Sequence, residues 1–392
     1  MDRKFQDSGH SPERLILPVI LFAGTLTVMA GTIIAPVLNV MRDQLGVGPS
    51  RAGLIITTHS VFIALLSPFI GHLIDRVGVR RPLVAGLVLY SAAGGAGLVI
   101  DSWWPLIVSR ALLGAGAAVI FIANTVMILN LYSGRRRNRV MGWRSSANAL
   151  GAAIWPAIGG ALGAYSWHWP FAAYLAGIPL ALLVLFIIPE THRTQPDGPE
   201  NNNVSLVQIF RAAPVLLGIY GLIFLSSVLL YALVVYGPPL MEQASITNPF
   251  QIGLFVSSMG LASALVAVMY GRIKASFSYR ALIMFALALW TVAFLPISQW
   301  LSAGIIAAAF TVYGASQGVI SPVCMVWIGE VTPRSYLGRV SSYLGSFAFV
   351  GQFASPVIFA PVALRAGPQG VFFVSGMIGV LLLVILAIFW RK

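Results

Sequence analysis

Charged residues are scarce in this chain. Only 9% of its 392 residues are Asp, Glu, Lys or Arg, whereas a soluble protein carries about 25%. So few charged groups cannot cover the surface of a water-soluble domain of this length. Because 58% of the residues are hydrophobic, the composition indicates a protein that crosses a membrane several times.

Cysteine and catalytic signatures are also missing. The single cysteine, Cys324, excludes an intramolecular disulfide and a multi-cysteine metal site. No G-x-x-x-x-G-K-[ST] loop for nucleotide phosphates and no H-E-x-x-H metal motif occur in the sequence. We therefore expect no enzyme activity, no metal and no cofactor. Any transport has to draw its energy from an ion gradient or from the gradient of the substrate itself.

Long apolar runs, in contrast, recur along the whole chain. A helix needs about 20 mainly apolar residues to cross the bilayer, and a barrel strand only about 9–11 of alternating polarity. The runs predict an all-α polytopic membrane protein with twelve transmembrane helices. They cover roughly 15–38, 52–74, 83–100, 104–131, 141–163, 169–189, 214–236, 250–271, 281–299, 303–328, 340–364 and 371–390. The first run exceeds a signal-peptide core of about 7–15 residues, so it is expected to be an uncleaved helix.

Basic residues are distributed unevenly between the two sides of these spans. Twenty of the 24 Lys and Arg residues fall at the termini or in connections on the side of the N-terminus, and Arg144 is counted among them. The other side holds Arg42, Arg51 and Arg365, and Arg110 lies within a span. This asymmetry predicts cytoplasmic N- and C-termini and a multi-pass protein of a bacterial inner (plasma) membrane. The excess positive charge is thus a topology signal, and no nucleic-acid partner is expected.

The longest polar segment divides the chain into two similar halves. We predict an N-terminal six-helix bundle at 1–189, a cytoplasmic central loop at 190–213 and a C-terminal six-helix bundle at 214–392. A shift of 200 residues aligns Gly71 with Gly271, Arg80 with Arg280, Gly114 with Gly314, Arg139-Val140 with Arg339-Val340, Gly151 with Gly351, and Pro156 with Pro356. Two parallel six-helix repeats are typical of transporters that hold their substrate between two bundles.

The connection GHLIDRVGVRRPL (71–83) resembles a loop of the major facilitator superfamily, G-x-L-a-D-r-x-G-r-k-x-x-l. The matching positions include Gly71, Asp75, Arg76, Gly78 and Arg80. The resemblance implies that Asp75 meets Arg139 and the helix start at 338–342, which latches the cytoplasmic gate. The alternative is a role in topology and folding alone.

Two further residues could titrate or carry charge within the membrane. The segment LIVSRALLGAGAA (106–118) is similar to the family pattern l-x-x-x-R-x-x-q-G-x-g-a-a. In the proton-coupled exporters of the family, the arginine that matches Arg110 is implicated in proton transfer; the alternative is a side chain that reaches the outer surface. His59 lies within the second span and can shuttle a proton, or it is simply hydrogen-bonded.

The fifth span resembles the antiporter motif of the 12-helix drug:proton antiporter branch, G-x8-G-x3-G-P-x2-G-G. Its positions here are Gly142, Gly151, Trp155, Pro156, Gly159 and Gly160. Trp155 replaces a glycine, and an indole fills space that glycine leaves empty. Trp155 is therefore also a candidate for the substrate cavity.

No carboxylate falls in the middle of any predicted span. Exporters of organic cations usually offer a buried acid as counter-charge, so a neutral amphipathic or an anionic substrate is favoured. Candidate cavity residues are Asn124, Trp143, Asn148, Tyr231, Tyr313, Gln317, Tyr343 and Gln352. For any one of them, packing is the alternative role.

These observations predict a secondary active transporter of the lipid bilayer. The preferred function is proton-coupled antiport that exports a small amphipathic or drug-like molecule by alternating access, as in multidrug efflux. Its partners would be the small-molecule substrate and protons, and we expect a monomer. Within transport, the alternative is an importer or facilitator of a small metabolite, an anionic one included. A non-transporting membrane sensor is the remote alternative.

Overall fold

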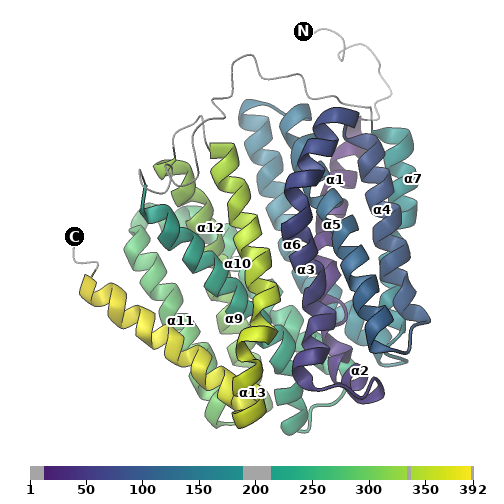
Figure 1. The fold of residues 1–392 in the computed structure, drawn as a ribbon. Helices are drawn as coiled ribbons and strands as arrows, with labels where there is room; N and C mark the ends of the chain where they lie inside the picture. Colours follow the sequence, from purple (N-terminus) through teal and green to yellow (C-terminus); the bar gives the residue numbers. More distant parts are fainter. Residues whose placement is uncertain (1–12, 189–212, 333–336, 390–392) are drawn as a thin grey trace.

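The computed structural model describes residues 13–188, 213–332 and 337–389, and every secondary-structure element in these ranges is a helix (Figure 1). The predicted central loop therefore lies outside the described residues, except for Ala213. In the first half the elements are α1 (Glu13–Thr32), η1 (Ala35–Val37), α2 (Leu38–Gln44), α3 (Pro49–Val77), α4 (Arg80–Gly95), η2 (Ala96–Leu98), α5 (Trp103–Leu131), α6 (Gly134–Gly163), η3 (Trp169–Ala176) and α7 (Gly177–Ile187). In the second half they are α9 (Val215–Gln243), α10 (Pro249–Ser276), α11 (Tyr279–Gln299), α12 (Ala303–Val331) and α13 (Leu337–Phe389).

Each of the twelve predicted spans coincides with a helical segment. Within the described ranges, nine helices are long and apolar enough to cross a membrane. The remaining segments are α4, which has only 16 residues, α6, which begins with a basic run, and the second part of α13. Because Gly367 has a φ of 65°, α13 is two helices joined at a turn, and its last part runs back beside α11 (Figure 1).

Helix α6 begins at Gly134, seven residues before the predicted fifth span. Arg144 falls within the predicted span although it was counted with the basic residues of the connection, and in the structure it lies nearly three turns inside the helix. Its side chain is 8% exposed. Arg144 is therefore buried, although in the sequence it follows a cluster of basic residues that are predicted to lie at the membrane surface.

The repeat of 200 residues is visible as the same helix crossing in both halves. A Cβ atom added to Gly114 of α5 would lie 2.5 Å from the His59 carbonyl oxygen of α3. A Cβ on Gly314 of α12 would lie 2.1 Å from the Met259 carbonyl oxygen of α10. Each glycine thus lets two helix backbones touch, which is how small residues stabilise helix contacts in lipid.

The two halves, side by side in Figure 1, meet along two seams that the repeat also relates. One seam joins α3 to α13, where Gly53 packs against Pro356; the other joins α6 to α10, where Gly253 packs against the Pro156 carbonyl. The second seam is the tighter one, because a Cβ on Gly260 would lie 2.4 Å from the backbone of Ala152.

Candidate functional site

At the end of the molecule that carries α2, here the α2 end, polar side chains join the two halves. Arg42 of α2 pairs with Glu242 of α9 at 3.1 Å and with its own neighbour Asp43 at 2.7 Å. Asn39 donates a hydrogen bond from Nδ2 to the Pro238 carbonyl oxygen at 2.8 Å, and Asn39 is only 7% exposed. The α2 end is therefore closed by an ion pair and a buried hydrogen bond.

The opposite end holds the residues predicted to form the gate. A Cβ on Gly71 or Gly142 would meet nothing within 4 Å, so these positions are open. Gly78 ends α3 with a φ of 85°, a conformation that glycine adopts without strain. Asp75, Arg76 and Arg139 are exposed, and Arg80 opens α4 with a half-buried side chain.

The latch that the resemblance implies stays a prediction. Of its proposed partners in 338–342, the side chains at 338, 339, 341 and 342 lie outside the described residues.

His59 lies in a polar chain that links the two halves near the middle of α3. Its Nδ1 is 2.7 Å from the Ile56 carbonyl oxygen, and its Nε2 is 3.3 Å from the Ser60 hydroxyl oxygen. Ser60 donates to the Gln352 Oε1 atom of α13 at 2.7 Å. The Tyr231 hydroxyl of α9 and the His59 ring both lie within 2.8 Å of where a Gly31 Cβ would be. Three of the predicted site residues, His59, Tyr231 and Gln352, are thus brought together.

Arg110 lies inside the first half, and its hydrogen bonds go to residues outside this polar chain. It is fully buried, which does not support a side chain at the outer surface. Its Nη2 donates to the Gly94 carbonyl oxygen at 3.0 Å, where α4 gives way to η2, and its guanidinium lies about 5 Å from the ring centroids of Phe171 and Tyr174. Carbonyls and aromatic faces therefore solvate this cation.

A second polar group surrounds Gly24 of α1. A Cβ there would lie 2.9 Å from the Asn148 Oδ1 atom of α6 and 3.2 Å from the Asn124 Nδ2 atom of α5, with Arg144 beside them. Asn124 donates to the Ile20 carbonyl oxygen at 2.9 Å. Sequence reasoning missed Arg144, although its spacing to Asn148 indicates a shared helix face.

The other cavity candidates are dispersed. Tyr313, Gln317 and Ser226 bond to one another between α12 and α9, with distances of 2.6–2.9 Å, so their polar atoms are already used. Tyr343 is half-buried against the apolar core. Trp143 is 45% exposed, on the same helical face as Leu150 and Ile154, and such a face is typical of a contact with lipid.

The antiporter-like residues of α6 pack against both neighbours of that helix. A Cβ on Gly159 would collide with the Ile33 carbonyl oxygen, and one on Gly160 would lie 2.4 Å from the Pro249 carbonyl oxygen of α10. Trp155 covers Gly151, with its Nε1 atom 3.3 Å from the position of a Cβ. These glycines therefore bring α6 close to its neighbours at the α2 end.

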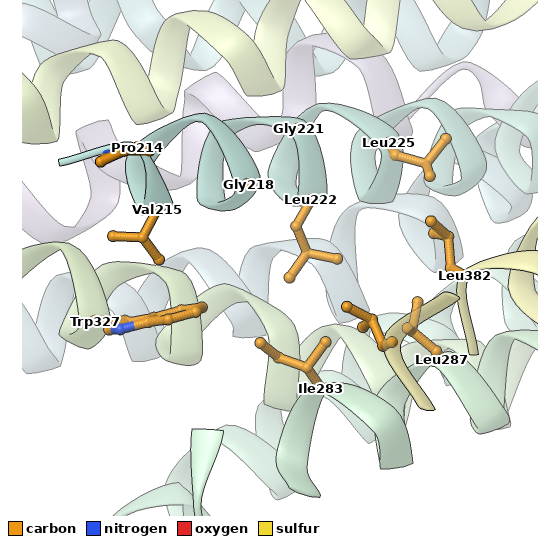
Figure 2. A pocket seen from close by; sticks show the side chains of 11 residues that line it. Pro214, Val215, Gly218, Gly221, Leu222, Leu225, Ile283, Leu287, Trp327 and Leu382 are labelled. Carbon is orange, nitrogen blue, oxygen red and sulfur yellow. The ribbon is translucent and has the colours of Figure 1, made fainter. Parts of the chain in front are cut away.

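An apolar groove of about 560 Å³ lies between α9, α11, α12 and the end of α13 (Figure 2). Trp327 stands at one end and Leu382 at the other, with Val215, Leu222 and Ile283 between them. Its lining carries no charged side chain, and the indole of Trp327 is the one polar side-chain group among the lining residues.

One short sequence match has no catalytic geometry. Gly314-Ala315-Ser316-Gln317-Gly318 has the spacing of a hydrolase nucleophile motif, G-x-S-x-G. The motif requires a strand-to-helix turn, whereas Ser316 lies inside α12 and donates to the Ala286 carbonyl oxygen at 3.1 Å.

In the described residues, two all-helical halves with repeated helix crossings meet at one end and share a polar chain, which is typical of a membrane transporter fold. The Major Facilitator Superfamily model matches residues 20–259 and 239–392, and the chain belongs to this family of multi-pass integral membrane proteins. This finding confirms the family and fold class that the loop motifs predicted.

Relatives and solved structures agree with that assignment. The chain is 25% identical to the multi-drug resistance efflux pump PmrA of Streptococcus pneumoniae, over 92% of both chains. It is also 25% identical to the multidrug transporter protein MdtP of Bacillus subtilis, over 51% of this chain and 37% of that one. The inward-facing, unoccupied structure of a bacterial homologue of the human lysosomal transporter Spinster has a TM-score of 0.78, with 14% identity and 96% of both chains covered. The D-xylose–proton symporter reaches the same TM-score at 16% identity, over 97% of this chain and 98% of that one.

Proposed function

We propose that the protein exports small amphipathic molecules by alternating access and that the structure is its inward-facing state. The observation that carries this proposal is the asymmetry between the two ends. Arg42–Glu242 and Asn39–Pro238 join the halves at the α2 end, whereas at the other end a Cβ on Gly71 or Gly142 would meet no atom of the described residues within 4 Å. The positive-inside distribution makes the α2 end the outer one, and a bacterial inner membrane fits the bacterial relatives.

Export rather than import is supported by the efflux pumps among the relatives and by the antiporter-like glycines of α6. The bundles would rock about the α6–α10 seam, because its backbone contacts leave no room for sliding. Asp75, Arg76, Arg80 and Arg139 would control the inner end.

Coupling to protons would run through His59. Ser60 has one hydroxyl proton, which it donates to Gln352. The Ser60 oxygen can then only accept a hydrogen bond from the Nε2 atom of His59. Every link of the polar chain is therefore a hydrogen bond when Nε2 carries a proton. Since Nδ1 also points at the Ile56 carbonyl oxygen, a doubly protonated ring satisfies every partner. Arg110 on α5 and Tyr231 on α9 are the other ionisable groups around it. Protonation would thus tie α3 to α13 in the inward-facing state.

The test uses everted vesicles with an acid interior, reported by a pH-sensitive dye. Neutral, anionic and cationic amphipathic compounds are added in turn, and an exported compound should collapse the gradient. His59→Gln should bind the same compound but no longer exchange it for protons. Uptake of the compound into right-side-out vesicles, without any gradient collapse, would refute export and favour the import alternative.

A further inference from the structure

One face of α6 carries four residues that we call the α6 stripe: Arg144, Asn148, Gly151 and Trp155. Spacings of four, three and four residues place them on the same side of the helix, over a length of about 16 Å. Helix α1 faces them, because a Cβ on Gly24 would touch Asn148 and a Cβ on Gly151 would lie 3.1 Å from Thr25. The stripe therefore lies where α1, α5 and α6 meet.

Two polar atoms of the α6 stripe are buried without a partner. In the described part of the chain, neither the Asn148 Oδ1 atom nor the Trp155 Nε1 atom has a hydrogen bond. A buried donor or acceptor without a partner is costly, and few native groups remain so. The α6 stripe is therefore a polar face inside the protein, unlike a face that only packs against other helices.

Arg144 adds a buried positive charge at one end of the stripe. Its Nη1 donates to the Thr125 hydroxyl at 2.8 Å, and its guanidinium lies 5.3 Å from the Phe121 ring centroid. No carboxylate within the described ranges forms an ion pair with it. A buried charge is normally paired, so an arginine held by a hydroxyl and an aromatic face is free to receive an anion.

The surroundings of the stripe are aromatic and reach the second half of the protein. Phe121 packs edge-on against Phe349 of α13, with ring centroids 5.4 Å apart. At the other end, Phe22 of α1 lies 6.4 Å from Trp155 between ring centroids. The stripe thus runs from a cation, past an amide, to an indole, and aromatic rings flank both ends.

We propose that the α6 stripe binds an amphipathic aromatic carboxylate, with the carboxylate at Arg144 and the aromatic body on the side of Trp155. The proposal rests on the proposed function, because it names the substrate class of the transporter. The positions 200 residues later are Leu344, Ala348, Gly351 and Ser355, so the cation, amide and indole belong to the first half alone. Arg144 can make two parallel hydrogen bonds to a carboxylate, which a neutral amide or an amine cannot receive.

The test compares three probes with one skeleton: 1-naphthaleneacetate, 1-naphthaleneacetamide and 2-(1-naphthyl)ethylamine. Binding is measured by calorimetry at pH 7 on the full chain in nanodiscs of uncharged lipid. The acetate should bind about 10- to 100-fold more tightly than the amide, since a charge-assisted pair is at stake, and the amine should not bind.

Three variants distinguish binding at Arg144 from a general attraction of the anion to a basic protein. Arg144→Gln should bring the affinity for the acetate down to that for the amide, and Arg144→Lys should keep part of the preference. Arg136→Gln is the matched control, because Arg136 lies on the same helix but is exposed; it should leave the preference unchanged. Affinity for the amide shows that each variant is folded.

The outcomes separate this inference from the transport proposal. Equal affinity for all three probes, no binding of the acetate, or an unchanged preference in Arg144→Gln overturns the assignment, whatever the vesicles show. Tight acetate binding without proton exchange in vesicles would instead refute the export mechanism and leave the site standing.

Discussion

The closure of the α2 end gives a prediction whose size can be worked from the structure. Arg42 and Glu242 are 19% and 36% exposed, so their ion pair should contribute about 0.2–1 kcal/mol, the range of pairs that water still screens. The Asn39–Pro238 hydrogen bond is buried and should add about 0.5–1.5 kcal/mol. Asn39→Ala with Glu242→Gln should therefore raise the outward-open population about 5- to 30-fold, which corresponds to about 1–2 kcal/mol.

The assay is a distance measurement between spin labels at the α2 end. Cys324 is the only cysteine and can be replaced by Ser to give a background without thiols. Labels are attached at Tyr165→Cys, just after α6, and at Trp300→Cys, just after α11, where the native side chains are 87% and 61% exposed. A second, longer distance should appear in the double variant. High salt screens the ion pair, so it should raise the population of the longer distance in the wild type and leave the double variant unchanged.

Asp43→Asn is the matched control for this experiment. It also removes one carboxylate from Arg42, but it leaves the contact with Glu242 in place. The control should keep the short distance. If the double variant behaves like the control, these contacts do not hold the α2 end closed and the reasoning fails.

Two further predictions concern packing. Gly260→Ala should cost about 1–3 kcal/mol and lower the melting temperature of the purified protein, because its Cβ meets the Ala152 backbone; Gly218→Ala, which meets nothing, should not. Arg110→Lys should also lower the melting temperature, since it keeps the charge but loses the planar contacts with the two rings. Wild-type melting with abolished flux would show instead that Arg110 acts in transport. Trp155→Ala, measured by the same calorimetry, should weaken 1-naphthaleneacetate binding about tenfold, because it removes the ring against which the naphthyl group packs.

The sequence predicted the helices well because length and apolarity are local properties. The apolar runs coincide with helical segments, and the repeat aligned Gly114 with Gly314, which the structure places at equivalent crossings with His59 and Met259. Ends of helices were less certain. Basic residues at a membrane surface look alike whether they lie in a connection or in the first turns of a helix, and Arg144 was assigned to the wrong one.

Contacts between the two halves could not be predicted from either half alone. Nothing in the sequence says that Ser60 faces Gln352 across the seam. Within the second half, it also does not say that Gln317 bonds to Tyr313 and Ser226. The α6 stripe, in contrast, could have been predicted from the sequence. Its residues recur at helical spacing, and one of them, Trp155, departs from the antiporter motif.

The ion pair between Arg42 and Glu242 bears on the history of the molecule. The two residues occupy equivalent positions, 200 apart, in the two repeats. In a symmetric dimer of identical six-helix chains, a position that meets its own copy on the two-fold axis would face an identical residue, and two like charges there would repel. Attraction at this point requires the copies to differ. Once the two repeats are joined in one chain, they can mutate independently. A contact between two identical residues can then become an ion pair between residues of opposite charge.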